Sequence, residues 1–283
     1  MIRVCITGAG SYIGTHIGLH LAKLPGQFET VELDVSKPWQ PEQLDGFDAV
    51  VHVAGIAHQK ETDENRALYA AVNRDLTLEV AKAAKANGVK QFVFFSSMSV
   101  YGMNVGHIDT SVQPAPESAY GESKWEAEQG LSELADDSFH VAVLRPPMIY
   151  GKGCRGNYPR LSSLARSLPM FPKVKNQRSM LYIGTLCSFV QNLLESGEGG
   201  LYFPQNREYV NTTALVKEVA RCHHRRMLAV PGFGWFLKRV ERKSLLIGKV
   251  FGSLTYDQRM SDAFRPEDEL DFAATIAQTE DMQ

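Results

Sequence analysis

Short apolar runs alternate with helical patterns over the first half of the chain. The runs that predict buried strands cover Ile2–Thr7, Phe28–Leu33, Asp48–Ala54, Gln91–Phe95 and Val141–Leu144. Between them, apolar residues recur every three or four positions, which predicts helices. The clearest such stripe consists of Leu68, Val72, Leu76, Val80 and Ala83, and it ends near Gly88. Further helices are predicted from a turn after Thr7 to about Leu24 and from about Ser118 to Leu134.

Strands that alternate with helices form βαβ units, which build a parallel sheet with helices on both faces. Fully apolar strands support this arrangement, because such a sheet is covered on both sides. The predicted fold class is therefore α/β, with a doubly wound parallel sheet of the Rossmann type over residues 1–150. After Tyr150, glycine and proline punctuate a loop-rich stretch. We interpret residues 151–283 as a smaller C-terminal lobe, from which some segments return to the main domain.

Composition narrows the class of protein. The 283 residues are 44% hydrophobic, which is enough for a sizeable core and argues against disorder. A formal charge of −2 creates no global field for nucleic acid. No segment approaches the roughly 18–20 uninterrupted apolar residues of a membrane span, and the first residues lack the pattern of a signal peptide. Because the four cysteines are far apart, we expect no disulfide framework or metal site, and we expect a cytoplasmic protein.

A glycine-rich turn follows the first predicted strand. Thr7–Gly14 reads TGAGSYIG and leads directly into a helix. Glycines at such a turn let backbone N–H groups approach a pyrophosphate, and the helix N-terminus adds a favourable partial positive charge. The position between a strand and a helix makes this turn a candidate dinucleotide site.

A serine, a tyrosine and a lysine form the second candidate site. Tyr120 and Lys124 are four residues apart in YGESK and share one helix face. An ammonium group beside a phenol favours the phenolate, so we expect the pKa of Tyr120 to fall from about 10 toward working pH. Such a tyrosine suits general acid/base chemistry on an alcohol or carbonyl. A serine at the end of the preceding strand, most simply Ser97, would hydrogen-bond the same oxygen.

Six motifs in order and at suitable spacing resemble one known family. They are TGAGSYIG, DAVVHVAG, VNRD, FFSSMSVYG, YGESK and LRPPMIYG, and the resemblance covers about residues 1–215. The sequence resembles the extended short-chain dehydrogenase/reductases, in particular the NAD-dependent epimerase/dehydratase branch that acts on nucleotide sugars. The resemblance implies NAD or NADP as cofactor, with NAD favoured, a UDP-linked sugar as substrate, a substrate-binding second lobe and a homodimer.

The resemblance also implies roles for individual residues. Those implied to bind the cofactor are Gly8, Gly10, Ser11, Tyr12, Ile13, Gly14, Asp34, Val35, Ala54, Gly55, Asn73, Tyr120, Lys124 and Pro147. The implied catalytic residues are Ser97, Tyr120 and Lys124, and the implied substrate contacts are Ser97, Ser99, Asn157 and Arg178. Arg178 would bind the substrate diphosphate through bidentate hydrogen bonds. Arg145 would lead, with the two prolines after it, toward the sugar-nucleotide pocket.

Four features depart from the pattern of this family. Ser11 replaces the usual second glycine of the motif. Only one strand precedes DAVVHVAG where the family has two, so Asp34 resembles an adenine contact and no acid for the adenosine ribose is identifiable. The usual aspartate at the start of a later helix is missing, and Thr185 could cap that helix instead. Met98 and Ser99 replace the acidic pair of the 4,6-dehydratases, which excludes water elimination.

Other features have simpler interpretations. Adjacent side chains in Cys222–His224 point apart on a helix, so they do not predict a metal site. His52 is interpreted as a hydrogen-bonded histidine near the site rather than a catalyst, and His58 as a residue that could border the active site. The basic amphipathic stretch 232–254 could lie on a membrane surface, but packing on the second lobe is favoured.

The leading hypothesis is an epimerase that inverts C4 of a UDP-linked sugar. A 4-ketoreductase of a UDP-4-keto-6-deoxy sugar would use the same residues and remains open. A dinucleotide-binding sensor without catalysis is the third hypothesis, although sensors usually lose the tyrosine and lysine that this chain keeps.

Overall fold

A computed structural model describes residues 1–57, 61–232, 248 and 251–281. At its centre is a six-stranded sheet in the order β10-β6-β4-β3-β1-β2, in which every pair of neighbours is parallel. The strands are β1 (Ile2–Thr7), β2 (Phe28–Leu33), β3 (Ala49–His52), β4 (Gln91–Phe95), β6 (His140–Leu144) and β10 (Gly200–Tyr202). The predicted α/β class and parallel sheet are confirmed.

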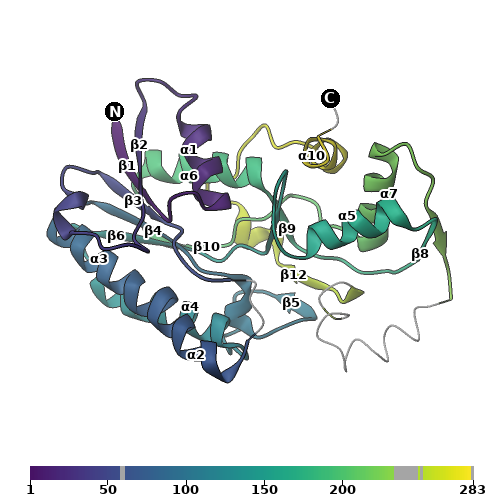
Figure 1. The fold of residues 1–283 in the computed structure, drawn as a ribbon, viewed down its shortest axis with the longest axis horizontal. Helices are drawn as coiled ribbons and strands as arrows, with labels where there is room; N and C mark the ends of the chain where they lie inside the picture. The colour runs from purple at the N-terminus through teal and green to yellow at the C-terminus, as the bar shows by residue number, and fades with distance from the viewer. Residues whose placement is uncertain (58–60, 233–247, 249–250, 282–283) are drawn as a thin grey trace.

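Helices cover both faces of this sheet (Figure 1). Helices α1 (Tyr12–Leu21) and α6 (Ile183–Ser196) lie on one face, and α3 (Leu76–Ala86) and α4 (Ala119–Leu134) lie on the other. Successive residues of β1 show the reason, because Val4 packs into the core on the α1 side and Cys5 into the core on the α3 side. Strands that are apolar on both faces are thus buried from both sides.

The predicted helical stripe from Leu68 to Ala83 is one continuous helical run in three parts. It comprises α2 (Asp63–Ala70), a π-helical turn (Ala71–Asp75) and α3. Asn73 lies in the π-helical turn and is fully buried. Such turns widen a helix locally and are frequent at functional sites.

Within its described residues, the second half adds short strand pairs and further helices beside the main sheet. The helices are α5 (Asn157–Ser167), α7 (Thr212–Cys222) and α10 (Phe272–Thr279). The parallel pairs are β7 (Met148–Tyr150) with β9 (Met180–Tyr182), β8 (Met170–Pro172) with β11 (Leu228–Val230), and β5 (Gly106–Ile108) with β12 (Leu254–Tyr256). Short 3₁₀ turns occupy Pro41–Leu44, Met98–Tyr101 and Gln258–Ser261.

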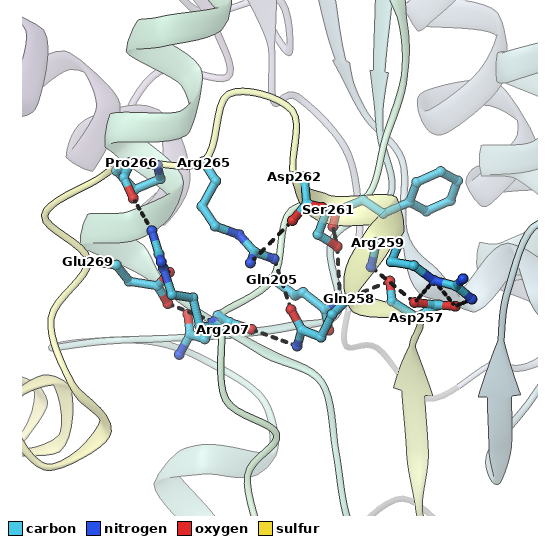
Figure 2. Close-up of polar contacts among 12 residues, drawn as sticks. Gln205, Arg207, Asp257, Gln258, Arg259, Ser261, Asp262, Arg265, Pro266 and Glu269 are labelled. Carbon is cyan, nitrogen blue, oxygen red and sulfur yellow. Dashed lines mark hydrogen bonds and ion pairs between the residues drawn. The ribbon is translucent and has the colours of Figure 1, made fainter.

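Hydrogen bonds connect the C-terminal segment, at Ser261 and Glu269, to the loop that follows β10 (Figure 2). Gln205 Nε2 donates to Ser261 Oγ at 2.9 Å, and the Arg207 backbone N–H donates to Glu269 Oε1 at 2.9 Å. Because β10 pairs with β6 at the edge of the main sheet, these contacts connect the end of the chain to the first domain.

One expectation about a helix start is wrong. Helix α6 begins at Ile183, its cap position is Tyr182, and no side chain caps it. Thr185 lies inside the first turn and is buried, so it cannot take the place of the missing aspartate.

Candidate active site

The glycine-rich turn lies against the end of β3. Gly8 has φ +95°, and a Cβ there would lie 2.8 Å from the backbone nitrogen of Ala54. Only glycine permits both this conformation and this approach. A Cβ on Gly14 would meet Val53 Cγ2 at 3.0 Å, so the first turn of α1 packs closely on the same strand end. Gly10 also has a positive φ, of +70°, and no atom lies within 4 Å of a Cβ placed there.

Ser11, which departs from the family pattern, caps α1. Its Oγ accepts a hydrogen bond from the Gly14 N–H at 3.1 Å, which satisfies one of the free donors of the helix N-terminus. The next residues of the motif direct their side chains inward. Tyr12 Oη points toward Gly151, where it is buried without a hydrogen-bond partner, and Ile13 packs on the core. These residues would therefore meet a cofactor through backbone groups.

The end of β2 brings two carboxylates to the same turn. Glu32 Oε2 accepts a hydrogen bond from the Gly10 N–H at 3.0 Å. Asp34 follows the strand, and its carboxylate accepts from the Ser36 N–H and pairs with Lys37 Nζ at 3.0 Å, which lowers its pKa.

The position of β2 corrects the interpretation of this region. Because β2 pairs with β1 along its whole length, Asp34 lies at the strand end beside the glycine-rich turn. That is the place where dinucleotide folds hold the acid for the adenosine ribose, about 20 residues after the turn. The pairing of β2 with β1 therefore makes Asp34 a candidate for this acid, and Glu32 is a second candidate that sequence reasoning missed. Val35, by contrast, is buried in the core on the α3 side.

Asn73 holds the loop after β3. Its Oδ1 accepts from the Ile56 N–H at 2.8 Å, and its Nδ2 donates to the Ile56 carbonyl at 3.1 Å and to Ser123 Oγ at 3.2 Å. One buried amide thus joins the loop that contains Gly55 to helix α4. Lys124, on the same helix, is 5% exposed, and its Nζ lies 3.4 Å from the position of a Cβ on Gly55.

Ser97, Tyr120 and Lys124 are brought together by β4 and α4. Ser97 caps the 3₁₀ turn after β4, with its Oγ accepting from the Ser99 N–H at 3.1 Å, and its side chain lies close enough to Tyr120 to lower the pKa of that phenol. Helix α4 approaches closely here, because a Cβ on Gly121 would lie 2.6 Å from the Ser99 carbonyl oxygen.

The electrostatics of the pair differ from the expectation. Burial raises the pKa of the Tyr120 phenol, and the Ser97 side chain offsets only part of this increase. Burial lowers the pKa of Lys124 to about 7, against the opposing charge of Glu128. The expected lowering of the tyrosine pKa is therefore wrong for this structure: burial raises it, and Lys124 is not among the groups that shift it.

A buried ion pair lies behind this site and was not predicted. Arg145 and Glu128 are 4% and 6% exposed, and Arg145 Nε donates to both carboxylate oxygens at 3.1 Å. Arg145 Nη1 donates to Tyr101 Oη at 2.8 Å, and the Ser96 hydroxyl donates to Glu128. The pair joins the ends of β4 and β6 to α4, and Arg145 faces the protein interior rather than leading toward a pocket.

His52 has the structural role expected of it. Its Nδ1 contacts Thr7 Oγ1 at 2.7 Å and its Nε2 contacts Thr77 Oγ1 at 3.0 Å. Burial lowers its pKa to about 3, so the ring is neutral at pH 7. The prediction that His52 is a hydrogen-bonded histidine is confirmed.

Arg178 is a cation held by backbone groups. Its Nη1 donates to the carbonyl oxygens of Gly252 at 2.8 Å and Gly248 at 3.3 Å, and burial lowers its pKa to about 10. Asn157 is the first residue of α5 and is half-buried, and Pro147 is buried between β6 and β7. Their contacts with substrate and cofactor stay predictions.

Some expectations fall outside or beside this site. His58 and most of the basic stretch 232–254 lie outside the described residues. His223 Nε2 contacts Glu280 Oε2 at 2.7 Å, and within residues 1–57, 61–232, 248 and 251–281 no three metal-ligating side chains gather. In the same part of the chain, no helix is long and apolar enough to cross a membrane.

Comparisons with known proteins identify the family of the chain. A model of the NAD dependent epimerase/dehydratase family matches residues 4–202. The chain belongs to this family. A UDP-glucose 4-epimerase from Vibrio cholerae is 31% identical over 245 residues, which cover 83% of this chain and 72% of that protein. An N-acetyl-alpha-D-glucosaminyl-diphospho-ditrans,octacis-undecaprenol 4-epimerase from Escherichia coli O157:H7 is 31% identical over 240 residues, covering 77% of this chain and 71% of that protein.

The fold of the family is also that of solved structures. The crystal structure of a UDP-glucuronic acid 4-epimerase from Bacillus cereus in complex with NAD superimposes with a TM-score of 0.77 at 17% identity, covering 99% of this chain and 96% of that chain. The predicted family is confirmed, and the chain is an enzyme of the nucleotide-sugar epimerase and reductase type.

Proposed function

We propose that this enzyme is an NAD-dependent 4-epimerase of a UDP-linked sugar. The observation that carries the proposal is the close packing of α4 on two loops: a Cβ on Gly121 would lie 2.6 Å from the Ser99 carbonyl oxygen beside Ser97, and a Cβ on Gly55 would lie 3.4 Å from Lys124 Nζ. This arrangement offers a phenol, a hydroxyl and an amine beside the loop that follows β3. Those groups suit proton transfer to and from a sugar oxygen.

The residues of the glycine-rich turn fit a dinucleotide. Gly8 and Gly10 both have positive φ, and the capped N-terminus of α1 directs its dipole toward the same turn. Glu32 and Asp34 at the end of β2 would accept hydrogen bonds from a ribose and repel a 2′-phosphate, which favours NAD over NADP. When bound, the cofactor takes a hydride from the sugar and returns it.

The chain itself supplies the proton chemistry. Tyr120 accepts the proton of the C4 hydroxyl when that carbon is oxidised, and it gives the proton back when the carbonyl is reduced. Ser97 holds the same oxygen through its hydroxyl. Lys124 is ammonium below about pH 7, and its charge then favours the phenolate that the first half of the reaction requires. Inversion requires the keto sugar to present its other face before reduction.

Arg178 supports a diphosphate substrate. Its guanidinium is largely desolvated, and the hydrogen bonds described for it go to backbone carbonyls. A largely desolvated cation that no carboxylate of the described residues pairs with favours a bound anion. The proposed substrate is therefore a sugar carried on a diphosphate, as in UDP-sugars.

A 4-ketoreductase is the second candidate, and one observation favours it. Because burial raises the pKa of Tyr120, the phenol is protonated at neutral pH and ready to donate to a carbonyl. A reductase needs only this half of the cycle. Cofactor that copurifies through gel filtration would support the epimerase, whereas oxidation of added NADH or NADPH by a 4-keto sugar would support the reductase.

Replacing Tyr120 with phenylalanine tests either activity. We expect turnover of a UDP-hexose, followed by separation of the epimers, to fall by about 10²–10⁴-fold while NAD binding persists. Tyr202→Phe is the matched control, because Tyr202 Oη donates to the Gly199 carbonyl at the sheet edge. Unchanged turnover in Tyr120→Phe would refute catalysis by this phenol, and the absence of turnover together with retained NAD binding in the wild type would favour a sensor.

A further inference from the structure

Four exposed apolar side chains lie together at the end of the molecule formed by α5, β8 and β11. Figure 1 shows this end beside α7 and away from the six-stranded sheet. Leu164 and Leu168 are one helical turn apart, and the Leu168 N–H donates to the Leu164 carbonyl at 2.9 Å. Met170 and Leu228 are register partners in the β8–β11 pair. We call these four residues the apolar tip.

The side chains of the apolar tip are exposed to solvent rather than packed against other apolar side chains. Met170 is 53% exposed and Leu228 is 65% exposed, whereas Phe171, which follows Met170 on β8, is buried. Side chains of register partners point to the same face of a sheet. Leu164 and Leu168, at 40% and 41%, extend the exposed surface along the end of α5. A soluble protein gains nothing from such a cluster unless something covers it.

Basic residues surround the apolar tip. Residues 157–175 and 221–232 contain no Asp or Glu. Their Lys and Arg residues are Arg160, Arg166, Lys173, Lys175, Arg221, Arg225 and Arg226, all of them exposed. Only Arg221 among these pairs with an acid, Glu218, in the ion pairs of the described residues. Two acids from neighbouring elements also contact these segments, Glu218 at Arg221 and Glu280 at Ser162 and His223. The overall charge of −2 therefore conceals an excess of cations at this end of the molecule.

We propose that the apolar tip docks on the surface of an anionic phospholipid bilayer. Peripheral binding of this kind combines aliphatic side chains that enter the headgroup region with Lys and Arg that contact anionic headgroups. The tip supplies both on one surface. The apolar tip contains none of the residues proposed to bind cofactor or substrate, so the proposal goes beyond the proposed reaction and does not depend on it.

Two other occupants fit less well. A second copy of the chain in a twofold contact would bring the same cluster of cations against itself, which is repulsive. Nucleic acid would be attracted by the cations, but single strands are bound through aromatic stacking. The exposed large side chains here are leucine and methionine.

Vesicle co-sedimentation of the full chain tests the proposal. One vesicle preparation contains phosphatidylcholine alone, and the other contains equal parts of phosphatidylcholine and phosphatidylglycerol. We expect binding to the anionic vesicles only, weaker at high salt because headgroup contacts are screened. Met170→Glu with Leu228→Glu should weaken this binding about tenfold, since two apolar contacts are lost and two negative charges added.

Two further variants make the outcome decisive. Leu19→Glu changes another exposed leucine, 61% exposed on α1, and should bind vesicles like the wild type. Arg225→Glu with Arg226→Glu changes exposed charges outside the strands, and it should also weaken binding. It therefore tests the proposal even if the glutamates on β8 and β11 disturb folding. No binding of the wild type to anionic vesicles would overturn the proposal. The proposal would also be overturned if Met170→Glu with Leu228→Glu and Arg225→Glu with Arg226→Glu both bound anionic vesicles as tightly as the wild type. Preferential binding of the wild type to duplex DNA, or self-association of the wild type that these two variants abolish, would overturn it as well.

Discussion

The amine of Lys124 lies directly against the backbone of Gly55. A Cβ added at Gly55 would be 3.4 Å from Lys124 Nζ and 2.9 Å from Asn73 Oδ1. The loop after β3, the buried amide and the lysine of α4 therefore share one tightly filled space. Because the amide also holds Ile56 through two hydrogen bonds, a small change at Gly55 acts on both the loop and the lysine.

Gly55→Ala should reduce activity more than stability. The added methyl forces Asn73 or the loop to shift, and a displacement of this size at a site can lower turnover about 10²-fold. The free energy of unfolding should fall by about 1–3 kcal/mol, as for other overpacked sites. Steady-state kinetics and urea unfolding measure the two effects.

The control for this change is Gly18→Ala, in helix α1. The nearest atom to a Cβ there is 3.6 Å away, so the variant should be active and as stable as the wild type or more so. Full activity of Gly55→Ala would show that the space around Lys124 is less constrained than the distances indicate.

Glu128→Gln should destabilise the protein strongly. The substitution leaves the guanidinium of Arg145 buried without a carboxylate, which typically costs about 3–5 kcal/mol. Urea unfolding monitored by circular dichroism gives the value. Glu126→Gln, two residues away on α4, removes an ion pair with Arg74 whose side chains are about one-third exposed, and it should change stability by about 0–1 kcal/mol. Equal effects of the two variants would contradict a special role of the buried pair.

Local patterns in the sequence were sufficient for much of this structure. Strands β1, β2, β3, β4 and β6 follow from apolar runs, whereas β5 was not predicted. The turn at Gly8 follows from glycines at a strand end, because both kinds of pattern depend on residues close together in the chain. The positions of Ser97 and Tyr120 follow in the same way from the ends of β4 and the start of α4.

The remainder depends on contacts between distant segments. The pairing of Arg145 with Glu128 requires two strand ends and a helix to meet, and nothing in the spacing of these residues predicts it. The place of Asp34 became clear only from the pairing of β2 with β1. The raised pKa of Tyr120 arises from burial, which a pattern of residues along the chain does not measure.

Cofactor preference should depend on the carboxylates at the end of β2. Glu32 already contacts the Gly10 N–H, so a 2′-phosphate near this turn would meet like charge. We expect NADH to bind more tightly than NADPH, and Glu32→Ala with Asp34→Ala to reduce that preference by about tenfold or more. Calorimetry measures both affinities. Glu29→Ala, at the other end of β2 in an exposed pair with Arg3, is the control and should keep the preference. A wild type that binds NADPH more tightly would contradict the assignment.

Lys124→Met should raise stability at neutral pH while abolishing activity. Burial lowers the lysine pKa from 10.5 in the unfolded chain to about 7 in the folded chain. Between these values the unfolded chain binds a proton that the folded chain lacks, so the free energy of unfolding of the wild type increases with pH across this window. Below about pH 7 the folded chain must bury an ammonium, and only part of its desolvation is offset by the Phe94 ring, 4.7 Å from Nζ. Methionine removes that penalty, so the variant should be more stable than the wild type at pH 7, with the difference shrinking toward pH 10. Lys82→Met, which changes an exposed lysine of α3, should keep the pH dependence of the wild type. Urea unfolding at several pH values compares the three proteins, and a Lys124→Met protein less stable than the wild type at pH 7 would show that the amine is stabilised rather than strained by its surroundings.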